Sequence, residues 1–379
     1  MTMKYTMLLL FLGMITSAFS QGVRQKVDSI AKRYDAIGVA YVVVKDGQIF
    51  HSDAVGYKDW DQKIALSAST DLFRIASISK SFTATALMQL VEANKLSLDA
   101  DFGDMIGFRV RNPYFPDKVI TLRMLLSHTS SISDKNGYFN LDAINPNKNP
   151  EWERGYNNYE PGSQYEYCNL NFNMAGAALE RAVGVRFDIY IKQKILAPLG
   201  LKGGYCVDSL DKGAFAKIYE YDGVKRQFEA QPAAYAPRSE EIRNYKLGYT
   251  TPVFSPTGGM KISTEDLARY MIMHMNYGES AGVRILQQSS ARTMQTPVNK
   301  WAGYGLALRE NKNLISGKTM VGHTGSAYGL YSTMFFQPEE RFGIVAITNG
   351  CKQTFEDDKP ELLEEVVDCL YKHFILFAK

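Results

Sequence analysis

The chain has 379 residues, of which 45% are hydrophobic and 22% charged. These are ordinary values for a globular protein and exclude wholesale disorder, and the length predicts roughly two to three structural units. The 43 basic and 40 acidic residues leave a formal net charge of +3, so the chain lacks the basic excess of nucleic-acid-binding proteins and we expect no nucleic-acid partner.

Residues 1–20 have the pattern of a secretory signal peptide. Lys4 precedes an apolar run over residues 7–15, and Ala18 and Ser20 place small side chains before a cut at Gln21. The run is too short to span a bilayer, although a membrane anchor or a buried strand is an alternative interpretation. We therefore expect a secreted or periplasmic protein whose mature part has no stable membrane span.

Cysteines and histidines are sparse. Export permits disulfides, but the sequence does not choose among the three possible pairings. There is no Cys-x-x-Cys motif and the histidines are scattered, so we expect neither a metal site nor a cofactor. The cysteines are Cys168, Cys206, Cys351 and Cys369, and the histidines are His51, His128, His274, His323 and His373.

The first elements of the mature chain are an amphipathic helix and a strand pair. Val23, Val27 and Ile30 follow helical spacing, and the apolar residues 38–44 predict a buried strand. A turn over residues 45–48 then leads into a return strand that begins at Ile49. Residues 77–93 are apolar on nearly all sides, which predicts a central buried helix.

The middle and the end of the chain differ in character. Residues 133–167 are rich in Asn, Pro, Gly and Tyr and predict a long structured loop, whereas residues 170–183 return to helical patterning. Residues 331–336 and 342–349 predict adjacent strands, and a final helix follows Pro360.

Strands at both ends with helices between them indicate an α/β (α+β) fold, with an antiparallel sheet built from both termini and flanked by helices. We expect a single catalytic domain over residues 21–379. Its sheet subdomain comprises about residues 21–75 plus 250–379, and a mostly helical subdomain is inserted over about residues 76–249.

A serine can act as a nucleophile when a lysine one helical turn away shares its helix face. The spacing Ser-x-x-Lys occurs at Ser29, Ser77 and Ser209, so the motif alone does not decide. Only Ser77, with Lys80, opens a long apolar helix, where its backbone N–H is free of helical bonding and can face an oxyanion. An ordinary N-cap serine is the alternative.

Two further motifs complete the candidate site. Tyr-x-Asn would supply a phenol as a proton relay and an amide that holds the substrate. Of its three copies, beginning at Tyr138, Tyr156 and Tyr167, only Tyr167 with Asn169 lies at a fixed loop-to-helix junction. The run His323-Thr324-Gly325-Ser326 lies beside the predicted edge strand, where glycine lets a substrate approach the backbone. Surface tyrosines and an ordinary glycine turn are the alternatives.

These motifs occur in order, and the chain resembles the serine β-lactamase and penicillin-binding protein superfamily. The resemblance is to the class C-like branch with its D-alanyl-D-alanine carboxypeptidases, D-aminopeptidases and esterases, and it covers roughly residues 30–350. The segments that carry it are Phe73–Thr83, Thr121–Ser130, Pro161-Gly162 with Tyr165–Asn169, Pro256–Met260 with Ser263–Leu267, and His323–Gly325.

The resemblance implies a role for each residue of the site. Ser77 would be the nucleophile, Lys80 its hydrogen-bonded cation, and Tyr167 the base, kept as a phenolate by the charge of Lys80. Asn169 would contact the acyl side of the substrate, and His323 and Thr324 would border the pocket. The backbone N–H groups of Ser77 and Ser326 would form the oxyanion hole.

Two positions depart from the family pattern. The lactamases usually carry lysine where this chain has His323, and a mostly neutral histidine weakens the demand for a carboxylate on the substrate. Ser131 replaces the usual glycine after His-Thr-Ser, so a different loop backbone is expected. The rival nucleophile Ser280, in Gly278-Glu279-Ser280-Ala281-Gly282, lacks the strand before it and the helix after it that such an elbow needs.

The favoured hypothesis is a secreted serine hydrolase or acyltransferase with an acyl-Ser77 intermediate. Its partner would be a small-molecule or peptide acyl substrate, that is, an ester, an amide or a D-amino-acid peptide. A true β-lactamase, a D-Ala-D-Ala carboxypeptidase and acyl transfer to a small alcohol remain alternatives, as does a non-catalytic binding or sensor protein on the same fold. The sequence leaves the oligomeric state open.

Overall fold

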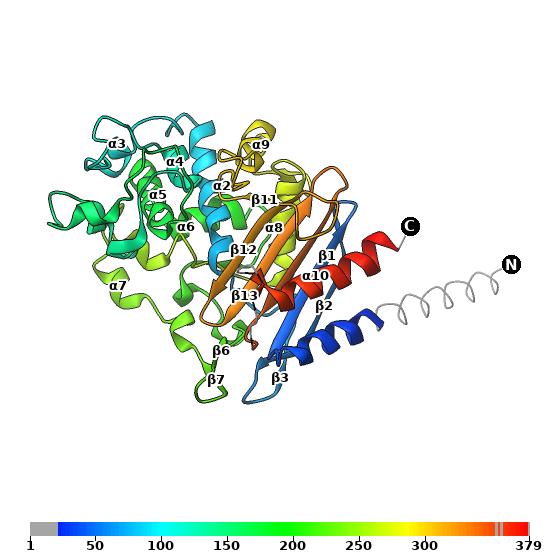
Figure 1. Ribbon diagram of the computed structural model, residues 1–379. Coiled ribbons are helices and arrows are strands. Elements are labelled where there is room, and N and C mark those ends of the chain that lie inside the picture. Colours follow the sequence, from blue (N-terminus) through cyan, green and yellow to red (C-terminus); the bar gives the residue numbers. More distant parts are fainter. Residues whose placement is uncertain (1–21, 353–354, 357–358, 378–379) are drawn as a thin grey trace, which may run out of the picture.

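The computed structural model describes residues 22–352, 355–356 and 359–377, so the expected leader over residues 1–20 lies outside the described residues. A seven-stranded antiparallel sheet forms one side of the molecule (Figure 1). In spatial order its strands are β11 (Arg309–Asn311), β12 (Met320–Ala327), β13 (Leu330–Gln337), β14 (Phe342–Thr348), β1 (Gly38–Lys45), β2 (Gln48–Asp59) and β3 (Ile64–Ala65). Because β1 pairs with β14, the two ends of the chain build one sheet, and the predicted fold class is confirmed.

Two terminal helices cover the outer face of this sheet (Figure 1). They are the helix over residues 22–33 and α10 (Glu361–Tyr371), which a π-helical turn, Lys372–Leu376, extends. Their apolar sides bury Val27 and Leu362 against Tyr41 and Ile344 of the strands. The amphipathic patterns of these two helices thus reflect one helical layer, whose apolar side faces the sheet.

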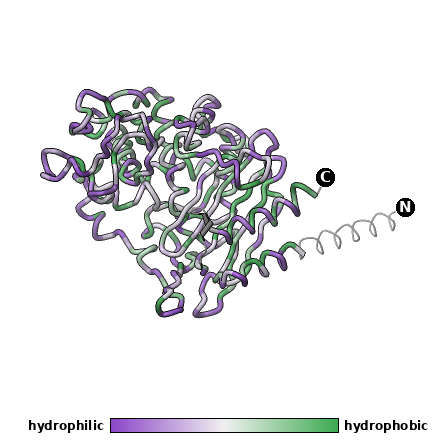
Figure 2. The backbone as a smooth tube through the Cα atoms, in the orientation of Figure 1, coloured by the Kyte–Doolittle hydropathy of each residue, from purple (hydrophilic) through white to green (hydrophobic). Residues whose placement is uncertain are grey.

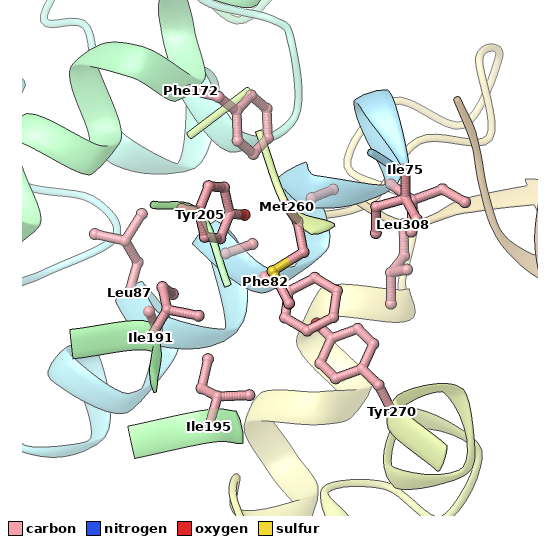
Figure 3. Packing of buried hydrophobic residues seen from close by; sticks show 14 of the residues in the cluster. Ile75, Phe82, Leu87, Phe172, Ile191, Ile195, Tyr205, Met260, Tyr270 and Leu308 are labelled. Atoms are coloured by element: carbon pink, nitrogen blue, oxygen red, sulfur yellow. The ribbon is translucent and has the colours of Figure 1, made fainter. Parts of the chain in front are cut away.

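The inner face packs on α8 (Thr264–Met275), behind which stands α2 (Ser79–Glu92). Phe82 of α2 and Tyr270 of α8 stack with ring centroids 3.7 Å apart, at the centre of the cluster in Figure 3. The same cluster includes Met260 and Tyr205. Figure 2 shows hydrophobic residues along the interior strands and helices, while hydrophilic residues dominate the outer loops. Because α2 is buried on nearly all sides, it forms the rigid centre on which the site is built.

The other helices are α3 (Phe102–Ile106), α4 (Leu122–Leu126), α5 (Asn169–Val183), α6 (Phe187–Ile191), α7 (Ser239–Arg243) and α9 (Gln288–Gln295). Helices α3 to α7 lie on the far side of α2 from the sheet, whereas α9 lies on the other side of α2 (Figure 1). The short strands are β4 (Phe73–Arg74), β5 (Gly203–Gly204), β6 (Tyr219–Asp222), β7 (Gln227–Ala230), β8 (Lys261–Ile262), β9 (Glu279–Ser280), β10 (Val283–Arg284), β15 (Phe355–Glu356) and β16 (Lys359–Pro360). The expected division into two subdomains remains a prediction.

Several local expectations are refined. The predicted loop over residues 133–167 contains three 3-10 turns, Asp134–Asn136, Leu141–Ile144 and Trp152–Gly155. Ser280 pairs with Val283 in a two-residue hairpin, so the segment around it is no strand–turn–helix elbow, as predicted.

Among the described cysteines, none of the three possible disulfide pairings forms, and Cys168, Cys206 and Cys369 each remain a thiol. Within the described ranges, no helix has the length and apolar character that a bilayer crossing requires.

Candidate active site

Ser77 lies at the junction of a short strand and the central helix. β4 pairs with β8 and delivers the chain into a 3-10 turn, η1 (Ala76–Ile78), which continues directly into α2. Ala76 has φ of 50°, a left-handed conformation that is unusual for a residue with a side chain. Ser77 itself is half-buried and lines a cavity of about 600 Å³. Its backbone N–H belongs to the first helical turn, where such groups lack a helical acceptor.

Lys80 follows one turn later and reaches back to Ser77. Its Nζ lies 3.1 Å from Ser77 Oγ, 2.9 Å from Asn169 Oδ1 and 3.0 Å from the carbonyl oxygen of Thr257. The side chain is fully buried. Burial lowers the pKa of Lys80 to about 7, although the negative charge of Asp134 opposes this shift. Near neutral pH the amine therefore exists in both forms, and its neutral form can accept a proton from Ser77.

Asn169 holds Lys80 in place. Its Oδ1 accepts hydrogen bonds from Lys80 Nζ and from the Thr257 hydroxyl at 2.9 Å, while Nδ2 donates to Asp134 Oδ2 at 2.9 Å. One amide N–H remains for a ligand in the cavity that Asn169 lines. The main contact of the Asn169 amide is therefore with Lys80, which it positions. The resemblance had implied a contact with the substrate.

Asp134 is a residue that the sequence analysis missed. Its carboxylate accepts hydrogen bonds from the backbone N–H groups of Asn169 and Leu170, both at 2.9 Å, and from Cys168 Sγ at 3.2 Å. It therefore caps the N-terminus of α5 from a distant loop. No local motif marks it, because it lies more than thirty residues before the helix that it caps.

Tyr167 lines the same cavity as Ser77, and the Ser77 hydroxyl is close enough to act on the pKa of the Tyr167 phenol. Lys80 Nζ lies 4.6 Å from the centroid of the Tyr167 ring, and the His128 ring lies 4.3 Å from it. The cavity exposes 37% of Tyr167, which moderates the effect of burial without changing its direction. Burial raises the pKa of Tyr167 above the ordinary tyrosine value, and the Ser77 hydroxyl only partly opposes it. This direction favours the protonated phenol over the phenolate that the resemblance implied, and the role of Tyr167 remains a prediction.

The run from His323 to Ser326 lies within β12 and not beside an edge strand. Tyr304 donates to His323 Nε2 at 2.8 Å, and His323 Nδ1 donates to the Thr324 carbonyl at 2.5 Å. Burial lowers the pKa of His323 to about 3, and the charge of Lys80 acts in the same direction. His323 is consequently neutral, as the sequence analysis argued, and serves as a hydrogen-bonded wall of the cavity.

The register of β12 orients two backbone groups toward the cavity. β12 and β13 are joined by a two-residue turn, and Ala327 opposes Leu330. Hydrogen bonding alternates along an antiparallel pair, so the N–H groups of Thr324 and Ser326 point away from β13. β11 pairs only with residues 320–322 of β12, and this edge is left facing the cavity that Thr324 and Ser326 line. The Ser326 N–H is thereby placed on the side of Ser77.

Gly325 brings β12 against the nucleophile segment. A Cβ at this position would overlap the carbonyl oxygen of Ile75, and it would also crowd Ser332 Oγ and the Ala76 side chain. The glycine is thus required for the close approach of β12 to η1, whereas the sequence analysis attributed it to the approach of a substrate.

The charge of the cavity comes from arginines. Arg309 of β11 and Arg74 line it, and no acidic residue in the described part of the chain does. The Nε of Arg309 is buried and has no hydrogen-bond partner among the residues that the structure describes. The sequence analysis missed Arg309, because an isolated arginine in a short strand carries no motif.

The remaining sequence motifs fall into structural roles. Ser131 has φ of 64°, so it adopts the left-handed conformation that favours glycine, and its hydroxyl accepts a hydrogen bond from Asn112 Nδ2 at 2.8 Å. Lys32 of the first Ser-x-x-Lys copy pairs with Asp28 on the first helix. Tyr138, from a Tyr-x-Asn copy that was set aside, nevertheless lines the cavity. Within the described residues, no cluster of ligating side chains suited to a metal ion is present.

Comparisons with known proteins identify the family of the chain. A family model described as "Beta-lactamase" matches residues 23–367. Protein flp of Staphylococcus aureus (strain MRSA252) is 24% identical over 323 residues, which cover 82% of this chain and 59% of flp. Penicillin-binding protein 4 of Amycolatopsis lactamdurans is 26% identical over 368 residues, which cover 90% of this chain and 89% of that protein. The chain thus spans 59% of the length of the flp relatives that it matches.

Solved structures share the fold. The octameric penicillin-binding protein homologue from Pyrococcus abyssi superposes with a TM-score of 0.72 at 25% identity, covering 95% of this chain and 77% of that one. EstCE1, a hydrolase with promiscuous acyltransferase activity, gives 0.71 at 20% identity, with 93% and 99% covered. The D-amino acid amidase from Ochrobactrum anthropi SV3 gives 0.71 at 20% identity, with 94% and 98% covered.

Proposed function

The chain belongs to the β-lactamase family of serine hydrolases, and we propose that it hydrolyses or transfers an acyl group through an ester intermediate on Ser77. One observation carries the proposal: Lys80 Nζ lies 3.1 Å from Ser77 Oγ at the wall of a cavity that Tyr167 also lines, with the Tyr167 ring 4.6 Å from the same amine. A hydroxyl, an amine that can be neutral and a protonated phenol are the groups that acyl transfer requires.

The charge states support a division of labour different from the one that the resemblance implied. Neutral Lys80 takes the proton of Ser77 as Oγ attacks the acyl carbonyl. The N–H groups of Ser77 and Ser326 stabilise the developing oxyanion. Tyr167 donates its proton to the leaving group and regains one from Lys80. In the second half of the reaction, water or an alcohol takes the place of the leaving group. It attacks the acyl-Ser77 ester, the proton transfers through Tyr167 and Lys80 run in reverse, and the acyl group is released.

The cavity also bears on the substrate class. His323 cannot provide a cation, but Arg309 on the neighbouring strand is permanently charged and its Nε lacks a protein acceptor. We propose that Arg309 binds a carboxylate on the leaving-group side of the donor. Peptides with a free C-terminal D-residue and β-lactams then rank above simple esters, because Arg309 restores the demand for a carboxylate that His323 alone weakens.

The test uses two matched donors, a D-alanyl-D-alanine peptide and the same peptide with its terminal carboxylate amidated. The unmodified chain should favour the acid by about 10- to 100-fold in kcat/KM, which is the range expected for a charge-assisted contact of about 1.5–3 kcal/mol. Arg309→Ala should remove that preference, and the exposed Arg154→Ala should keep it. Equal rates for both donors in the unmodified chain would refute the role of Arg309.

Two alternatives retain specific support. Transfer to a small alcohol needs only that the alcohol replaces water, and it appears as an ester product when the alcohol is added. A non-catalytic binding protein would show no turnover of any donor and no difference between the unmodified chain and Ser77→Ala. We further propose that the chain is exported, on the pattern of residues 1–20. Detection of a mature form that begins at Gln21 in the extracytoplasmic fraction tests this.

A further inference from the structure

The cavity has two distinguishable ends, set by the direction of β12. Near the start of the strand lie His323, Tyr304 and Arg309, and the Tyr167 ring lies 6.3 Å from that of His323. Tyr328 follows the other end of β12. Because Tyr167 gives its proton to the leaving group in the proposed function, the leaving group lies toward His323. The acyl part of a donor must then extend toward Tyr328.

A second cavity of about 590 Å³ adjoins this acyl end. It shares Phe139 and Tyr328 with the active-site cavity, so these two rings form the boundary between the two spaces. Its charged residues, Arg238 and Glu241, pair with each other at 3.2 Å. Most of its remaining lining is apolar and comprises Leu141, Ala233, Ala236, Tyr249, Pro252 and Val253. The second cavity therefore suits an uncharged, apolar group.

The boundary itself is unusual. Tyr328 and Gly329 form the turn between β12 and β13, with φ of 58° and 84°. Such a turn favours Asn-Gly or Gly-Gly, and a tyrosine in the left-handed region is strained. The Arg74 guanidinium lies 5.0 Å from the centroid of the Tyr328 ring and holds it at the boundary. Phe139, the other residue that both cavities share, is 55% exposed.

From these observations we infer that the two cavities act as one acyl-donor channel, in which the acyl chain passes Tyr328 and Phe139 and places an apolar segment in the second cavity. The inference rests on the proposed function and adds the substrate class to it. The preferred donor carries an elongated apolar acyl group, and a short acyl group leaves half of the channel unused.

A series of p-nitrophenyl esters from acetyl to decanoyl tests this inference. In the unmodified chain, kcat/KM should rise about three- to fourfold for each methylene that the channel buries. Ala236→Trp fills the second cavity, and the decanoyl-to-acetyl ratio should fall at least tenfold. Ala233→Trp narrows the same cavity from another position and should act in the same direction. The matched control, Ala100→Trp, places the same side chain in a separate cavity that shares no residue with the active site, and it should keep the ratio.

The outcomes separate the two proposals. Acylation of Ser77 by the acetyl ester, with the same chain-length ratio in Ala236→Trp, Ala233→Trp and the unmodified chain, would overturn the channel and leave the proposed function standing. Absence of Ser77 acylation by every ester and by the peptide donors would overturn both. A fall in the ratio for the two cavity variants, with folding checked by their thermal transitions, supports the channel.

Discussion

Lys80 illustrates how burial sets chemistry at the level of one residue. Three oxygen atoms lie within 3.1 Å of its Nζ, but none of the three carries a charge, so desolvation decides its protonation. Desolvation also acts on Tyr167, which is less buried, in the direction that keeps its phenol protonated. The pair therefore works with a neutral base and a neutral acid, and no step needs a phenolate in the resting enzyme.

The first prediction concerns pH. Since the reactive form of Lys80 is the neutral amine, kcat/KM should be low below pH 6 and should rise with an apparent pKa of about 7. Tyr167 loses its proton only above the ordinary range for tyrosine, so no fall is expected before pH 9. A profile measured in constant-ionic-strength buffers should show this single rising limb. A rate that declines from pH 6 to 8 would assign the reactive form to the charged amine.

Asp134 allows a sharper test of the same electrostatics. Its negative charge raises the pKa of Lys80 against the effect of burial. Asp134→Asn removes this charge, so the rising limb of the pH profile should shift to lower pH, while the amide keeps one of the two acceptor oxygens that cap α5 and should lower the stability by no more than about 1 kcal/mol. The matched variant Asp99→Asn breaks a surface pair with Arg123 and should leave the limb in place. If the pH profile of Asp134→Asn rises at the same pH as that of the unmodified chain, the role of Asp134 is only to cap α5.

At the residue scale, the sequence predicted the groups whose relation is local. Ser77 and Lys80 lie one helical turn apart, so their proximity follows from the helix period. Asp134, Thr257 and Arg309 reach the site only through tertiary folding, and nothing near them in the sequence marks their partners. The direction in which burial shifts the pKa of Tyr167 was also not predicted, because burial is a property of the folded chain.

At the scale of elements, the site depends on the contact between β12 and η1. Gly325→Ala would place a methyl group on the Ile75 carbonyl and should lower the free energy of unfolding by about 1–3 kcal/mol, with loss of acylation as β12 is displaced from Ser77. Gly223→Ala is the control, since nothing lies within 4 Å of a Cβ there. Denaturant titration and acylation rates measure both effects. A Gly325→Ala variant as stable and as active as the control would show that this contact is not close-packed.

The long helices and the long strands of the sheet could be predicted where each has a clear period or turn. The strand predicted over residues 38–44 is β1, Gly38–Lys45, and the helix predicted over residues 170–183 is α5, Asn169–Val183. The segment from His323 to Ser326 was placed beside a strand because its Gly and Thr lack an alternating apolar pattern. Its strand conformation comes from pairing with β13, which only the assembled sheet provides.

At the scale of the whole molecule, the sheet joins the two ends of the chain. Leu362→Ala removes a fully buried side chain from the outer core that the first helix and α10 share, and it should lower the free energy of unfolding by about 2–5 kcal/mol. Asp368→Ala, on the exposed side of the same helix, breaks only the surface pair with Lys372 and should change it by less than about 0.5 kcal/mol. Denaturant titration measures both variants. Equal denaturation midpoints for Leu362→Ala and Asp368→Ala would indicate that α10 contributes little to the stability of the fold.

The most direct test of the account is the covalent trapping of its nucleophile. A serine-reactive phosphonate should add one label per chain by intact mass, and peptide mapping should place it on Ser77. Ser77→Ala should take up none, and Lys80→Met should label far more slowly at pH 7 because the base is missing. A label on any other residue, or equal labelling of the unmodified chain and Ser77→Ala, would contradict the account.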